Sequence, residues 1–142
     1  MIKPFKPLVS LGLVSGALAG IAAFVYEKVY STSLGVDFST IAKPAAIIVS
    51  CIVGCLIAAI GYWVLSKVLK DKTEPIFNLL FAVLSFLSIL PAFAVKLPLD
   101  ATSPELFPGM VIPMHFFPVL AFFTIEPFFI KTRIVDKKVV TV

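Results

Sequence analysis

Charged side chains are scarce in this sequence. Aspartate, glutamate, lysine and arginine make up 14% of its 142 residues, whereas hydrophobic residues make up 60%. A typical soluble domain is about 25% charged and about 45 to 50% apolar. The composition excludes an ordinary water-soluble globule, because one core could not hide so many apolar side chains. The lipid bilayer is the solvent that fits such a chain.

Cysteine and histidine are also rare, with two cysteines and one histidine in the chain. Cys51 and Cys55 lie four residues apart in one apolar run, so they project from one helical face. Parallel side chains one turn apart rarely reach disulfide geometry, and a zinc site needs about four ligands. We therefore expect both thiols to be small packing residues, and we expect no metal ion and no cofactor.

The familiar catalytic templates are missing too. The sequence has no glycine-rich phosphate loop, no Cys-x-x-Cys, no His-x-x-x-His and no nucleophile elbow. Its net charge is +4, but the basic residues lie at the ends of apolar runs and form no stripe with interleaved aromatic residues. Such residues are placed to contact lipid head groups. The sequence predicts a protein that is not an enzyme and does not bind nucleic acid.

Four long uncharged runs dominate what is present. Each has about the 20 residues that a helix needs to cross the hydrocarbon core of a bilayer. Lipid offers the backbone no hydrogen-bond partner, so each run is expected to be a helix. The sequence thus predicts an all-α polytopic membrane protein, an antiparallel bundle of four transmembrane helices in one domain over residues 1–142. The expected spans are about residues 8–26, 44–66, 75–96 and 108–130, followed by a basic cytoplasmic tail, 131–142.

The lysines and arginines between these runs indicate an orientation. Nine of the twelve lie in the N-terminal segment, in the turn between the second and third runs, or in the C-terminal tail. Basic residues near span ends concentrate on the cytoplasmic side of a membrane. We therefore expect both termini to be cytoplasmic, in a multi-pass protein of a bacterial inner (plasma) membrane.

Small residues recur at four-residue spacing in the first two runs. Gly12, Gly16 and Gly20 form one row in the first run, and Gly54 belongs to a similar row in the second. Such rows let helix backbones approach each other closely in lipid. The pattern predicts that these two helices pack together, and it leaves open an oligomer contact instead.

Polar residues within the spans are costly and are therefore candidates for a site. Three stand out, namely Asn78, His115 and Glu126. His115 and Glu126 are eleven residues apart, which at about 100° per residue places both on one helical face, about 16 Å apart. That face is expected to point toward the bundle or a partner subunit. Pro113 and Pro118 can kink the helix and change this phase.

This candidate site has two interpretations. In a functional one, Glu126 binds a proton or a cation, and His115 is a second proton site or a ligand for a metal or haem. In a structural one, Glu126 is hydrated or paired near Lys131 and Arg133 at the inner surface. His115 would then only hydrogen-bond a backbone carbonyl that a nearby proline has released.

The last span opens with Pro113-Met114-His115-Phe116-Phe117-Pro118. Together with the four apolar runs, this segment resembles uncharacterised small four-helix membrane proteins that many bacteria encode, a resemblance that implies no activity. The chain lacks the early intramembrane carboxylate of small multidrug transporters, because Glu27 is placed at the end of the first span. It also lacks the cysteine motifs of quinone-linked thiol oxidases.

The function that the sequence favours is assembly. The protein is expected to act as a homo-oligomer or as an accessory subunit of a membrane complex, with the bilayer and itself or another membrane subunit as partners. One alternative is a small transporter or channel that uses the His115 and Glu126 face. The other is a redox subunit associated with haem or quinone.

Overall fold

The computed structural model describes residues 5–97 and 103–130. The regular structure of this part of the chain is helical throughout, which confirms the all-α class. The predicted basic tail, 131–142, lies outside the described residues. In chain order the elements are α1 (Phe5–Leu34), α2 (Pro44–Leu69), η1 (Lys70–Lys72), α3 (Thr73–Leu87), α4 (Leu90–Ala94), η2 (Pro104–Leu106), α5 (Phe107–Met114) and α6 (Phe117–Ile130).

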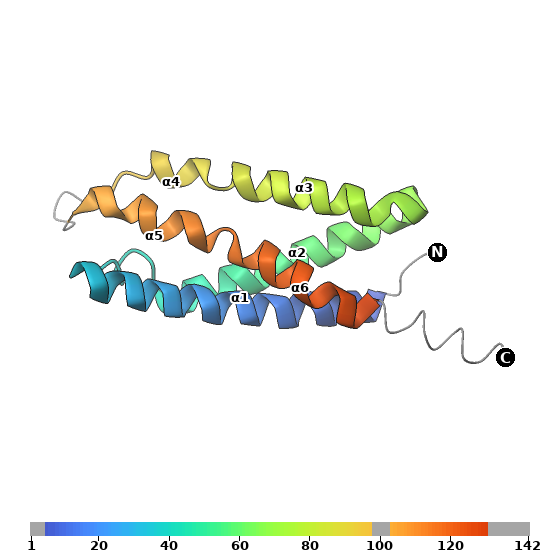
Figure 1. The fold of residues 1–142 in the computed structure, drawn as a ribbon, viewed down its shortest axis with the longest axis horizontal. Helices are drawn as coiled ribbons and strands as arrows, with labels where there is room; N and C mark the ends of the chain where they lie inside the picture. The colour runs from blue at the N-terminus through green and yellow to red at the C-terminus, as the bar shows by residue number, and fades with distance from the viewer. Residues whose placement is uncertain (1–4, 98–102, 131–142) are drawn as a thin grey trace.

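These elements form four segments that are long and apolar enough to cross a membrane, namely Phe5–Leu34, Pro44–Leu69, Thr73–Ala94 and Pro104–Ile130. Consecutive segments run in opposite directions along the long axis of the molecule (Figure 1). The start of α1 and the end of α6 lie at the same end, which we call the inner end. The opposite end, where α1 stops and α2 begins, is the outer end.

The glycine row of α1 lies directly against α2. A side chain at Gly16 would place its Cβ 2.5 Å from the Cα of Ile52, closer than real contacts allow. A Cβ at Gly12 or Gly20 would lie 3.0 Å from a backbone atom of α2. The two backbones therefore pack as closely as glycine permits.

The first helix extends well beyond residue 26, where the apolar run ends. It continues to Leu34, and Gly35 follows with a left-handed φ of +66°. The amide of Val36 then donates to the carbonyl oxygen of Ser31 at 3.1 Å. This is the Schellman pattern that commonly ends helices, so the helix stops at its glycine and not at its first charge.

The third and fourth segments are interrupted where proline removes a backbone donor. Pro91 lies just after the break between α3 and α4, and Pro113 and Pro118 flank the break between α5 and α6. At the second break the amide of His115 bonds the carbonyl of Ile112 at 3.2 Å, in a tighter turn than an α-helix has. The fourth segment is not one straight helix, so a regular helical period cannot be extended from His115 to Glu126.

Aromatic rings fill the bundle at both ends. Toward the inner end, Tyr62 of α2, Phe77 of α3 and Phe122 of α6 are buried in one cluster, with Leu8 and Leu11 of α1. Toward the outer end, Phe38 of the loop after α1 packs edge-to-face on Phe107 of α5, with ring centroids 5.4 Å apart. The α5 and α6 segment is thereby packed against the α1 and α2 pair.

The close contact between α1 and α2 predicts opposite effects of one methyl group at two glycines. Gly16→Ala should lower the free energy of unfolding by about 1 to 3 kcal/mol, because the new Cβ meets backbone that cannot rotate away. Gly54→Ala should leave the free energy of unfolding unchanged or raise it by up to about 1 kcal/mol, because alanine has the higher helix propensity and no atom lies within 4 Å of the Cβ position. Unfolding of both purified variants in one detergent measures the difference, and equal stability would contradict the packing.

Candidate functional site

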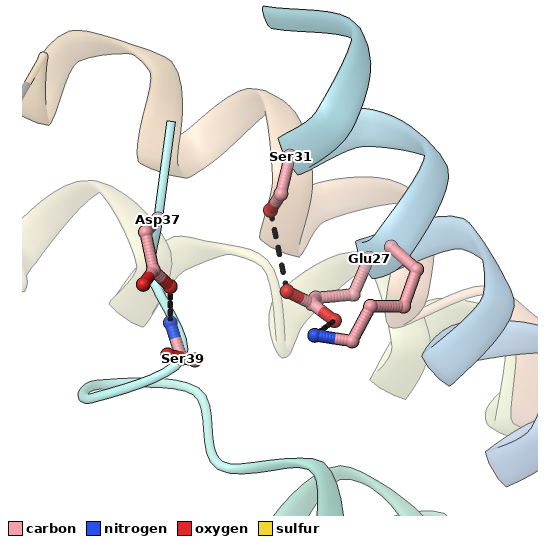
Figure 2. A network of polar contacts seen from close by, with 5 residues as sticks. Glu27, Ser31, Asp37 and Ser39 are labelled. Carbon is pink, nitrogen blue, oxygen red and sulfur yellow. Dashed lines mark hydrogen bonds and ion pairs between the residues drawn. The ribbon is translucent and has the colours of Figure 1, made fainter. Parts of the chain in front are cut away.

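A carboxylate that the sequence placed at the edge of the first span is buried inside the structure. Glu27 of α1 is only 1% exposed. The hydroxyl of Ser31 donates to its Oε1 at 3.2 Å, and the ammonium of Lys28 lies 3.2 Å from its Oε2. Figure 2 shows this group projecting from α1 beside the loop that leads to α2.

The position of Glu27 follows from the row of small residues before it. Gly16, Gly20 and Ala23 are buried on the face of α1 that meets α2, and Glu27 is the next residue on that face. Sequence reasoning missed this residue because it ended the span at the first charge. The four-residue spacing from Ala23 and the helix-stopping Gly35 are the signals that could have found it.

The loop beside Glu27 carries a second carboxylate. Asp37 accepts a hydrogen bond from the backbone amide of Ser39 at 2.8 Å (Figure 2). Hydrogen bonds from the side chain and backbone of Ser39 lower the pKa of Asp37, and the positive charge of Lys28 acts in the same direction. Lys28 therefore forms an ion pair with the buried Glu27 and has a smaller electrostatic effect on the exposed Asp37 of the loop.

A second polar group lies toward the inner end, around a cavity of about 180 Å³ lined by Glu74, Asn78 and Glu126. Glu126 is 6% exposed and Tyr62 is fully buried. The Tyr62 hydroxyl interacts with the Glu126 carboxyl group by hydrogen bonding, and the charge of Glu74 also acts on it. Among the described residues, the buried Oδ1 of Asn78 has no hydrogen-bond partner. The structure thus brings two predicted site residues, Asn78 and Glu126, into one cavity.

A larger cavity, of about 550 Å³, is an open apolar groove between α2, α3 and the break between α5 and α6. We call it the central groove. Its α2 wall includes Ser50, Gly54 and Gly61, and the opposite wall includes Leu84 and Ser85. Gly54, predicted as a helix-packing residue, has no atom within 4 Å of its Cβ position. It therefore faces open space, unlike Gly12, Gly16 and Gly20.

His115 lies at the helix break and lines the central groove. Its Nδ1 is 2.9 Å from the carbonyl oxygen of Val111, the acceptor that the His115 amide would use in a regular helix. Its own carbonyl accepts a hydrogen bond from Ser85 at 3.2 Å, which ties the break to α3. His115 lines the central groove, whereas Glu126 lines the cavity of about 180 Å³ toward the inner end. The two side chains therefore do not share a cavity.

The two cysteines are buried as free thiols. Cys55 contacts the Pro118 carbonyl oxygen at 3.7 Å through its sulfur. Within residues 5–97 and 103–130, no group of three or more histidine, cysteine, aspartate or glutamate side chains is arranged to hold a metal ion.

No protein-family model, curated protein or solved structure matches the chain. The resemblance of the Pro113 to Pro118 segment to small bacterial membrane proteins therefore stays an expectation. What the protein does is inferred from the geometry of its cavities and buried polar groups.

The Glu27 and Lys28 pair gives a prediction about buried charge. Lys28→Met should lower the free energy of unfolding at neutral pH by about 1 to 2 kcal/mol, because it leaves a buried carboxylate without its cation. The loss is moderate because the Lys28 side chain is 50% exposed.

The double variant Glu27→Gln with Lys28→Met is the matched control, since it removes both charges and keeps an acceptor for Ser31. It should recover at least half of the lost stability. If chemical unfolding shows the double variant to be as unstable as Lys28→Met alone, the buried carboxylate is not what the lysine stabilises.

Proposed function

We propose that the chain is a four-span antiparallel membrane protein of a bacterial inner membrane, with its inner end in the cytoplasm. The length and hydropathy of the four segments support insertion. The basic residues near the inner end support the orientation. Lys67 is one of them, and its ammonium lies 3.4 Å from the centre of the Trp63 ring, a pairing suited to the membrane interface.

This orientation predicts which loops a membrane-impermeant thiol reagent can reach. On intact cells, a cysteine introduced at Ser103 should react and one introduced at Lys72 should react only after the membrane is opened. The buried native thiols of Cys51 and Cys55 should contribute little background. Labelling of the Lys72 position, but not of the Ser103 position, on intact cells would reverse the topology.

We propose further that the protein acts by holding a molecule from the lipid phase in the central groove. The observation that carries this proposal is the groove itself, an apolar cavity of about 550 Å³ with a histidine and serines in its lining. Ligand sites are typically about 300 to 1,000 Å³, mostly apolar, with a few polar groups that fix orientation. Because the groove is open along the bundle, its ligand can enter sideways from the bilayer.

Assembly is the second candidate, and one observation favours it. Gly54 and Gly61 have no atom within 4 Å of their Cβ positions, and with Ser50 they form a row of small residues on α2. Rows of this kind receive a neighbouring helix in lipid. In this case a helix of a second copy, or of another membrane subunit, would occupy the groove in place of a small molecule.

Native mass spectrometry after purification in a mild detergent tests the two functions together. Binding predicts that each chain retains an apolar molecule, that Gly54→Phe loses it by filling the groove, and that Val14→Phe keeps it. Val14 is the matched control because its side chain is 41% exposed on the outside of α1. A wild-type chain without any bound molecule contradicts the binding proposal, and an oligomer that Gly54→Phe dissociates supports assembly in its place.

A further inference from the structure

The serine hydroxyls that line the central groove have already donated their protons to the backbone. Ser50 donates to the carbonyl of Ile47 at 2.9 Å, and Ser85 donates to the carbonyl of His115 at 3.2 Å. Ser88 donates to the carbonyl of Ser85 at 2.7 Å. A serine hydroxyl has one proton and two lone pairs. These three side chains therefore present only acceptors to anything in the groove.

His115 adds another acceptor. Its Nδ1 is 2.9 Å from the carbonyl oxygen of Val111, and a carbonyl oxygen can only accept, so Nδ1 must carry the proton. In the neutral imidazole the other nitrogen, Nε2, is then an acceptor. Among the described residues, no hydrogen bond to Nε2 is found. The geometry of one backbone contact thus fixes the hydrogen-bonding character of the whole ring.

The remaining residues of the groove lining add few hydrogen-bond donors. Pro118, which lines the groove at the break, has no backbone amide to donate. Cys51 is the one remaining side chain with a polar hydrogen in the lining, and a thiol is a weak donor. The described residues that line the groove include no aspartate, glutamate, lysine or arginine. A charged ligand would therefore lie there without a counter-ion, at a high cost.

We propose that the central groove binds a long apolar alcohol, with its hydroxyl donating to Nε2 of His115. This inference rests on the proposed function and adds the chemical class of the ligand. A quinone, ketone or aldehyde of the same shape has only acceptors, so it would meet acceptors across the groove and leave its oxygen unbonded. A site built around one hydrogen bond discriminates strongly against an analogue that cannot make it.

The position of His115 along its segment restricts the chemical class of the ligand further. It lies near the middle of the Pro104–Ile130 segment, whereas phospholipid head groups stay at the membrane surface. A phospholipid could lay an acyl chain in the groove but could not bring a donor to the ring. A molecule whose single small polar group is a hydroxyl, on an otherwise hydrocarbon body, satisfies both the apolar walls and the imidazole.

Binding of three matched probes to the full-length protein in detergent tests this inference. Farnesol, farnesal and farnesyl methyl ether share one hydrocarbon body, and only farnesol can donate a hydrogen bond. Calorimetric titration should show that farnesol binds at least about tenfold more tightly than the other two, the ratio expected for one unmade hydrogen bond. His115→Leu should remove this preference while the groove keeps its apolar affinity.

A second variant guards against misfolding at the helix break. His115→Gln keeps a polar side chain and offers an amide donor, so it should bind farnesal relatively better than the wild type does. If no probe binds the wild-type protein, the proposed function itself fails. If all three bind equally, the groove holds apolar molecules but the hydroxyl assignment is wrong, and a farnesol preference that survives in both variants overturns the role of His115.

Discussion

The contact between α1 and α2 is the constraint on which the other features of this small bundle depend. A Cβ at Gly16 would lie 2.5 Å from the Cα of Ile52, so only glycine permits the observed approach. Without water to drive apolar surfaces together, helices in lipid associate through close packing of this kind. The pair then presents the aromatic surfaces on which α5 and α6 pack. Because the Ile52 side of α2 is used by α1, its Gly54 side is left to line the groove.

The prolines determine where backbone polar groups are left free to bond a side chain or a ligand. In an unbroken helix every interior amide and carbonyl is paired, and a span offers little to a ligand. The break near Pro113 and Pro118 frees the Val111 carbonyl from the backbone ladder, and the imidazole of His115 takes it as a partner. One proton position follows from that contact, and with it the kind of ligand that the groove can accept. Local backbone irregularity and ligand chemistry are thus linked by a single hydrogen bond.

Composition and hydropathy predicted the helical class and the four long apolar segments, because both follow from the order of apolar and charged residues along the sequence. They do not predict that Glu27 is buried, because a charge at the end of an apolar run indicates the end of a span. In the structure, Gly35 ends the helix eight residues later. The common face predicted for His115 and Glu126 assumes the regular period of one continuous helix. The segment is broken between α5 and α6, so that period does not continue from His115 to Glu126. For Gly54 the pattern predicted a helix-packing residue, but within the described residues no atom lies within 4 Å of its Cβ position, because what lies opposite a helix face depends on the arrangement of all the segments.

The central claim is that the space between α2, α3 and the break at His115 is a binding site for a molecule of the bilayer. The most direct measurement is an experimental structure of the full-length protein purified with native lipids and held in a nanodisc. The account predicts elongated density between Gly54 and Leu84 with one end within hydrogen-bonding distance of the His115 ring. A groove closed by contact of α2 with α3, or filled by a protein helix, would contradict it.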